Sequence, residues 1–252
     1  MKKIIVGEKI VKSFGIEDEK RTILNNLSIE IAEGEFISVM GPSGSGKSTL
    51  LFAISGMDEV DSGRISFNGQ ELSTLSEEKL ADIRRTQMGM VFQQPYFLKN
   101  LNIIDNIVLL AVREQKKASN QLVQRAMKLM KETGIKELAQ REVTQVSGGQ
   151  LQRAGICCAL MNQPKIIFGD EPTGALNSKA SEEIMALFSK INAKGTTIML
   201  VTHDAKVAAQ TERVLFMKDG KIESELKLKA YKGRDLEQRT KMVMEQMQLL
   251  GI

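Results

Sequence analysis

A glycine-rich segment carries the residues with the clearest chemistry in this sequence. Between an apolar run and a helical pattern stand Gly41, Pro42, Ser43, Gly44, Ser45, Gly46, Lys47, Ser48 and Thr49. Glycines let successive backbone N–H groups turn inward around a phosphate, and the start of a helix adds partial positive charge. We expect Lys47 to reach the β- and γ-phosphates of a nucleotide and Ser48 to place its hydroxyl on Mg²⁺. The alternative is a glycine-rich turn without a ligand, which the flanking strand and helix disfavour.

Two adjacent acids, Asp170 and Glu171, follow the apolar run 166–168 and stand where a buried strand would end. In open α/β sheets, ligands sit at the carboxyl ends of the strands. Neighbouring like charges are costly unless a cation offsets them, and Mg²⁺ beside the glycine-rich loop would do so. We therefore expect Asp170 to hold the metal and Glu171 to act as general base on an attacking water. A solvated strand end that caps the next helix is the alternative.

The single histidine, His203, follows the apolar run 198–201. If that run is a strand of the same sheet, its imidazole lies at the same edge as the two acids. From there it could donate a hydrogen bond to the γ-phosphate. A lone histidine is more often a capping or packing residue, yet its place at this edge favours the catalytic interpretation.

The scaffold that would position these residues can be read from the apolar pattern. Continuous apolar runs at 36–40, 166–168 and 198–201 predict buried parallel strands, because strands covered on both faces meet no water. Alternating segments at 27–31 and 64–67 predict a smaller antiparallel sheet beside the parallel one. The fold class expected is therefore α/β.

Helical patterns account for much of the remaining chain. Residues 95–161 are mostly helical, which indicates an α-helical subdomain inserted into a domain that spans 1–227. In the tail, 228–252, we expect Asp235 to cap a helix with one apolar face. That face carries Leu236, Val243, Met247 and Leu250. It either covers its own subunit or contacts a second subunit or another protein.

A second glycine-containing turn precedes another helical pattern, and it consists of Val146, Ser147, Gly148, Gly149 and Gln150. Alone it is a good helix N-cap. Together with the glycine-rich loop and the acid pair, in matching order and spacing over residues 3–225, it resembles the signature of ABC-type ATPases. The usual signature begins with leucine, where this chain has Val146. The resemblance implies a P-loop NTPase core with a parallel sheet, a small antiparallel β subdomain and an inserted helical subdomain.

The resemblance also implies roles for further residues and names the cofactors as ATP and Mg²⁺. Phe14 stands where the family has an aromatic residue that stacks on adenine. Gln93 stands where it has a glutamine that senses Mg²⁺ and water, and His203 matches its switch histidine. The turn at 147–150 offers N–H groups, a hydroxyl and a helix dipole to an anion. In the family this turn faces the γ-phosphate on the P-loop of a second copy, so two copies enclose two ATP molecules.

Finer features resemble the bacterial antimicrobial-peptide resistance branch, which includes bacitracin- and lantibiotic-resistance transporters. They lie at 169–178, at 202–205 and in the basic tail near 232–234. The resemblance implies an integral membrane permease as the partner of this chain. It also implies a sensor kinase that interacts with the permease. ATPases of lipoprotein release or macrolide export remain alternatives, as does a nucleotide-dependent signalling switch on a permease. Asn177 is the reason to keep the signalling switch as an alternative function. The family usually has an aspartate at this position, and the charge of that aspartate would affect coupling across the dimer.

The composition argues against other classes of protein. A net charge of +4 spread along the chain gives no concentrated basic face, so we expect no nucleic-acid partner. The longest apolar run, 107–112, is far too short to cross a bilayer, and the first residues lack the pattern of a signal peptide. We expect the chain in the cytoplasm, held on the inner face of the membrane by the permease. We expect the permease to dock at the segment 95–98, which follows Gln93 and contains Tyr96 and Phe97. The alternative is that the side chains of 96–98 begin the core of the helical subdomain.

Overall fold

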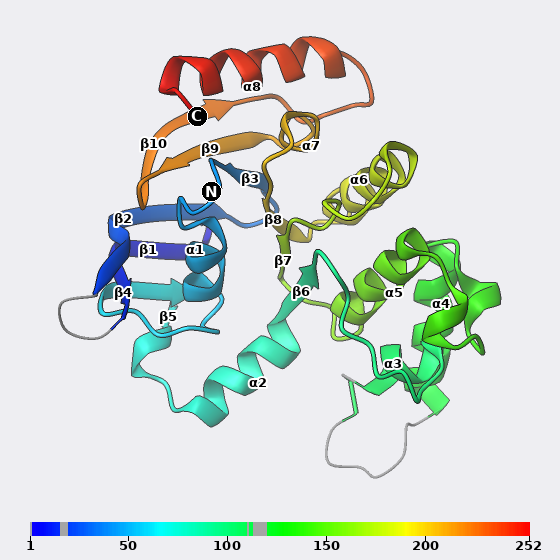
Figure 1. Cartoon of the computed structure of the whole chain (residues 1–252). Helices are drawn as coiled ribbons and strands as arrows, with labels where there is room; N and C mark the ends of the chain where they lie inside the picture. The colour runs from blue at the N-terminus through cyan, green and yellow to red at the C-terminus, as the bar shows by residue number, and fades with distance from the viewer. Residues whose placement is uncertain (1, 16–19, 110, 113–119) are drawn as a thin grey trace.

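The chain folds around two sheets that lie side by side (Figure 1). This computed structural model describes residues 2–15, 20–109, 111–112 and 120–252. The larger sheet has six strands in the order β10-β9-β3-β8-β7-β6, of which only β10 runs antiparallel to its neighbour. These strands are β3 (Phe36–Met40), β6 (Met88–Phe92), β7 (Ile166–Asp170), β8 (Thr197–Val201), β9 (Arg213–Lys218) and β10 (Lys221–Lys227). The three apolar runs of the sequence are thus adjacent parallel strands, as predicted.

The smaller sheet is antiparallel, with the order β2-β1-β4-β5. Its strands are β1 (Lys3–Phe14), β2 (Arg21–Ala32), β4 (Ser62–Phe67) and β5 (Gln70–Glu71). The predicted alternating segments 27–31 and 64–67 lie within β2 and β4. Helix α1 (Lys47–Ile54) contributes Leu50, Leu51 and Ile54 to a core shared by both sheets. The α/β class expected from the sequence is therefore confirmed.

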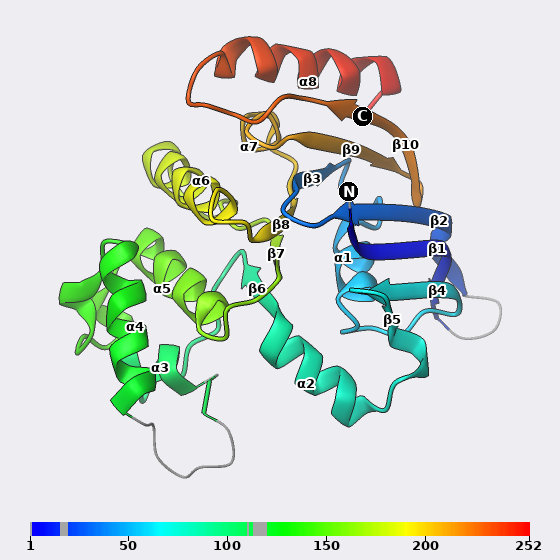
Figure 2. The same cartoon turned by 180° about the vertical axis from the view of Figure 1, so that it is seen from behind.

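A lobe of helices lies beyond β6, on the opposite side from the antiparallel sheet (Figure 2). It contains α3 (Ile103–Leu109), α4 (Asn120–Glu132) and α5 (Gly148–Leu160), with the short 3-10 turns η3 (Lys136–Leu138) and η4 (Val143–Gln145). The lobe has a core of its own, in which Ile107, Met130 and Cys157 are fully buried. Helix α2 (Glu77–Gln87) follows the 3-10 turn η2 (Leu72–Thr74), begins after the capping residue Ser76 and leads into β6.

Helix α8 (Leu236–Leu250) packs on its own chain, along β9 and β10 and beside α7 (Ala205–Ala208) (Figure 1). Val243 is completely buried in a cluster with Met40 and Phe216, and Leu236, Met247 and Leu250 pack against it. The expected cap is wrong in detail. Asp235 precedes the helix with φ of 61°, and its side chain makes no capping hydrogen bond. The buried guanidinium of Arg239 holds the start of the helix instead, through three backbone carbonyls.

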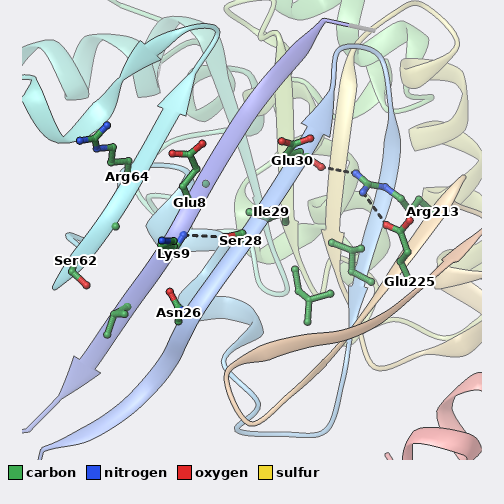
Figure 3. Close-up of a pocket in the computed structure, with 15 residues that line it drawn as sticks. Glu8, Lys9, Asn26, Ser28, Ile29, Glu30, Ser62, Arg64, Arg213 and Glu225 are labelled. Atoms are coloured by element: carbon green, nitrogen blue, oxygen red, sulfur yellow. Dashed lines mark hydrogen bonds and ion pairs between the residues drawn. The ribbon is translucent and has the colours of Figure 1, made fainter.

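Arg213 ties the two sheets together at their shared edge (Figure 3). From β9 it donates two hydrogen bonds to Glu35, one to the carbonyl oxygen of Glu30 on β2 and a longer one, of 3.3 Å, to Glu225 on β10. Burial by itself lowers the pKa of Arg213, but the bonds and charge of Glu35, followed by Glu225, raise it above its usual value. The guanidinium therefore stays charged and links β9 to the end of β2 and to β10.

Helix α6 (Ser178–Asn192) completes the cover of the large sheet, with Ile184, Met185 and Phe188 packed against β7 and β8. Among the helices that the structure describes, none has both the length and the apolar character needed to cross a membrane.

Candidate nucleotide-binding site

The predicted phosphate loop joins β3 to α1 and forms the floor of a pocket of about 760 Å³. The pocket is lined by Phe14, Ile23, Gly41, Pro42, Ser43, Gly44, Gly46, Lys47, Ser48, Thr49, Glu171, His203 and Met247. The structure therefore gathers residues from the start, middle and end of the chain around one loop. A larger hollow, of about 1040 Å³, lies across β1, β2 and β4 (Figure 3). No residue of the phosphate loop lines this hollow, and neither do the two adjacent acids or the histidine. Arg213 does line it, but its guanidinium is already hydrogen-bonded to Glu35.

The conformation of the loop requires glycine at two points. Gly46 has φ of 97°, in the region that side chains disfavour, and a Cβ there would approach the Ile23 carbonyl to 2.9 Å. A Cβ on Gly41 would lie 2.1 Å from the carbonyl oxygen of Met217, so the loop runs against β9 with no space for a side chain. Ser45 does not line the pocket. It is buried, and its backbone carbonyl accepts a hydrogen bond from Gly220 in the β9–β10 turn.

Lys47 lies in the loop with its ammonium close to the expected phosphate positions. Its Nζ donates to the carbonyl oxygens of Gly41 at 2.9 Å and Pro42 at 2.8 Å. An ammonium has three donors, so one remains beyond these two contacts for a phosphate oxygen. Burial lowers the pKa of Lys47, while the charges of Glu171 and Asp170 oppose that shift. The two acids thus help to keep the lysine protonated in a partly desolvated site.

The residues expected to hold Mg²⁺ converge at the ends of β6 and β7. Ser48 donates its hydroxyl to Asp170 Oδ1 at 2.9 Å, and burial raises the pKa of Asp170 above its usual value. A Cβ on Gly174 would lie 2.7 Å from Gln93 Nε2 and 3.2 Å from Glu171 Oε2, so both side chains pass close to this glycine. Hydroxyl, carboxylate and amide oxygens are the donors that Mg²⁺ prefers, usually with water and phosphate completing its shell. That donor set fits the residues present, and the described chain offers no larger cluster of acidic, histidine or cysteine ligands.

Glu171 and His203 form a pair beside the pocket. His203 Nδ1 lies 2.9 Å from Glu171 Oε1, and the two residues follow the neighbouring strands β7 and β8. Glu171 has φ of 47°, a strained conformation for this residue. Two backbone hydrogen bonds maintain it: Glu171 N donates to the Val201 carbonyl oxygen, and Gly174 N donates to the Glu171 carbonyl oxygen. In this conformation the Glu171 carboxylate lies within hydrogen-bond distance of the histidine.

The second glycine turn lies outside this pocket, in the helical lobe. Ser147 caps α5, where its hydroxyl accepts from Gln150 N and its own N–H donates to Gln150 Oε1. Ser147 and Gly148 are exposed to solvent. One chain therefore brings together Phe14, the loop, the acids, Gln93 and the histidine, but not the residues 147–150. Two lining residues, Ile23 and Met247, were not expected in the site, because neither belongs to a chemical motif.

The fold and this pocket together define a P-loop NTPase. The sequence pattern of the ABC transporter family matches residues 24–174. An uncharacterised ABC transporter ATP-binding protein of Methanocaldococcus jannaschii is 39% identical over 90% of this chain and 98% of its own length. The bacitracin export ATP-binding protein BceA of Halalkalibacterium halodurans is 39% identical over 88% of both chains. A dimeric ATP-binding cassette solved in a post-hydrolysis state with ADP and phosphate has a TM-score of 0.82 at 38% identity, covering 90% of this chain and all of that one.

The chain therefore belongs to the ABC transporter family. It is an ATPase cassette of that family, and its cofactors are ATP and Mg²⁺. A macrolide export ATP-binding/permease protein of Pasteurella multocida is 38% identical over 87% of this chain, which spans only 34% of that protein's length. The chain thus corresponds to about a third of such macrolide-export relatives.

Proposed function

We propose that two copies of this chain enclose two ATP molecules and that their closure drives an integral membrane permease. The observation that carries the proposal is the separation of the turn at 147–150 from the pocket of its own chain. This turn has the features of an anion site, with exposed backbone and a helix N-terminus, but no phosphate loop in its own chain faces it. A second copy placed head to tail supplies that loop. The dimeric state of the similar cassette supports the pairing of two copies.

Within each site, the chain's own residues divide the work of hydrolysis. Lys47 and the N–H groups of the loop hold the phosphates, and Phe14 stacks on the adenine. Ser48, Asp170 and Gln93 hold Mg²⁺, which when bound offsets negative charge on the phosphates. The contacts of Lys47 and of Ser48 with Asp170, and the approach of Gln93 to Gly174, support the roles at the phosphates and the metal. The place of Phe14 in the pocket wall supports its role at the base.

Glu171 acts as general base on the attacking water. The water oxygen bonds to the γ-phosphorus as the bond to the bridging oxygen breaks, and the water's proton passes to the carboxylate, giving ADP and phosphate. His203 holds the carboxylate through the 2.9 Å contact and donates a hydrogen bond to the γ-phosphate when the site closes. Removing either side chain leaves the phosphate loop intact, so binding and hydrolysis separate experimentally.

The permease docks beside Gln93, on the face that presents Tyr96 and Leu98. Tyr96 is 86% exposed, and its ring contacts that of Phe92 edge-on with 5.7 Å between the ring centroids, so most of its surface is open to a partner. Exposed aromatic residues of this kind serve as anchors at interface centres. Phe97 differs from its neighbours, because it packs against the core of the helical lobe. Docking is therefore assigned to Tyr96 and Leu98, with the chain held on the inner face of the membrane.

The transported class that we favour is antimicrobial peptides, with signalling through the permease to a sensor kinase. The similarity to the bacitracin export protein over most of both chains supports it. The macrolide-export relatives, at 38–40% identity, support a transporter of macrolides as the second candidate. A signalling switch differs from both, since its ATP turnover would not change when the permease carries cargo.

A resistance assay distinguishes these functions. The chain and its permease are expressed in a sensitive strain, and inhibitory concentrations of bacitracin and of a macrolide are compared with those of a Glu171→Gln control. The proposal expects resistance to bacitracin alone, and only with the parental chain. Resistance to the macrolide alone would favour the second candidate, and equal resistance with the Glu171→Gln control would refute an ATP-driven mechanism.

A further inference from the structure

The C-terminal helix α8 contributes one side chain, Met247, to the wall of the nucleotide pocket. Phe14, Ile23 and Met247 are the three large apolar side chains of that wall, and the rest consists of the phosphate loop with Glu171 and His203. A nucleotide has a single flat, weakly polar part, its base. The apolar end of the pocket is therefore where a base would bind, and Met247 stands in it although no sequence motif includes this residue.

The position of α8 against the pocket is fixed by buried contacts. Arg239 is only 5% exposed and donates to the carbonyl oxygens of Ala209, Thr211 and Lys229. One turn later Val243 is completely buried in the cluster that includes Met40, the residue directly before the phosphate loop. The next turn carries Met247. A side chain presented by so well anchored a helix is pre-organised for contact with a ligand.

The other end of α8 is tied to the hairpin that touches the phosphate loop. Lys218 Nζ donates to the carbonyl oxygen of Leu250 at 2.8 Å, and Ile252 N donates to the carbonyl oxygen of Met247 at 3.1 Å. Two residues after Lys218, the backbone N–H of Gly220 donates to the Ser45 carbonyl oxygen at 3.2 Å. Both ends of the segment that carries Met247 are thus linked to the loop region.

The ring of Phe14 is held beside the pocket by a cation–π contact. The ammonium of Lys12 lies 4.9 Å from the ring centroid and also donates hydrogen bonds to Asp58 and to the Glu59 carbonyl oxygen. Phe14 lines the pocket together with Ile23 and Met247, whereas Lys12 does not. The part of the ring that lines the pocket is available for stacking with a base.

We propose that Met247 is a base-contacting residue of the nucleotide site, so that α8 helps to determine affinity for the nucleoside part of ATP. This inference rests on the nucleotide site proposed above. A methionine suits the role because its flexible, polarizable thioether makes favourable contacts with aromatic rings. The phosphate loop binds the triphosphate independently of this contact.

Binding of two ligands to the full chain tests the proposal. Calorimetry gives the affinities for ATP and for tripolyphosphate, each with Mg²⁺; the second ligand has the phosphates but no base. Met247→Ala is expected to weaken the affinity for ATP by about twofold to tenfold, the range of one sulfur–aromatic contact, and to leave the affinity for tripolyphosphate unchanged. Met244→Ala is the matched control. Met244 is on the same helix, 58% exposed and outside the pocket lining, so neither affinity should change.

Two results would overturn the role of Met247: unchanged affinity for ATP, or an equal loss for both ligands, which would mean that the residue acts on the phosphate loop. Met247→Gln keeps the length of the side chain and decides the matter if Met247→Ala unfolds. A loss confined to ATP supports the contact, and unchanged ATP affinity refutes it. Lys47→Ala should weaken both ligands. If it binds both normally, the nucleotide site itself has been misplaced, which is a separate failure.

Discussion

Replacing Arg239 by alanine should destabilise the whole domain, although the residue lies far from the phosphate loop in the sequence. Its guanidinium is buried and donates to three carbonyl oxygens, on Ala209, Thr211 and Lys229. Hydrogen bonds from charged groups contribute roughly 1.5 to 3 kcal/mol each, but water can reach part of the site once the side chain is removed. We therefore expect a loss of about 3 to 5 kcal/mol in the free energy of unfolding, and a Tm lower by roughly 6 to 20 °C.

Thermal unfolding of the isolated chain without nucleotide measures this effect. Lys241→Ala is the control, because Lys241 lies on the same helix, is largely exposed and makes only a loose 3.8 Å pair with Glu245. It should change the free energy of unfolding by less than about 0.5 kcal/mol. A Tm of Arg239→Ala equal to that of the control would refute the anchoring of α8 by Arg239. A decrease that depended on protein concentration would instead mean that α8 stabilises a contact between copies.

Three further predictions concern hydrolysis, coupling and docking. Glu171→Gln should lower ATP turnover by about a hundredfold or more while ATP binding persists and closed dimers accumulate on size exclusion; turnover near the parental rate would contradict its role as base. Asn177→Asp should leave the Tm unchanged, because either side chain can accept the Ala180 N–H that now caps α6 at 2.9 Å, yet it should change the Hill coefficient of hydrolysis. An unchanged Hill coefficient and rate would show that the position tolerates both. Tyr96→Ala should weaken co-purification of the permease at unchanged Tm, whereas Phe97→Ala should lower the Tm; a Tyr96→Ala variant that binds the permease normally would exclude the docking face.

The parts of the site that the sequence predicted share one physical origin. Buried parallel strands appear as unbroken apolar runs, and the residues directly after such strands must meet at one edge of the sheet. Strands β3, β8 and β7 are neighbours, so the loop, the histidine and the two acids came together as expected. The contacts from Ser48 to Asp170 and from Glu171 to His203 follow from that order.

Other features depend on packing between distant segments, which no local pattern records. Met247 reaches the pocket only because Arg239 and Val243 hold α8 against the large sheet. Asp235 has the right residue type for a cap, but the approach of the chain to α8 places it in a left-handed conformation, and its side chain makes no cap. Phe97 and Tyr96 are adjacent aromatic residues with opposite surroundings, one against the helical core and one in solvent. Amino-acid composition alone cannot tell which of these two aromatic side chains is exposed.

The end of β6 is where the nucleotide edge, the helical lobe and the docking face meet. Phe92 pairs with Asp170 across the strands, so its position is linked to the acid that bonds Ser48. Its carbonyl oxygen accepts a hydrogen bond from Gln152 on α5, five residues after the cap of the second glycine turn, and its ring supports Tyr96. The Oε1 atom of Gln152 is buried and has no partner in the described part of the chain, an uncommon arrangement for a buried amide. Phe92 thus links the acid of the nucleotide edge, helix α5 of the helical lobe and Tyr96 of the docking face through its pairing, its carbonyl oxygen and its ring.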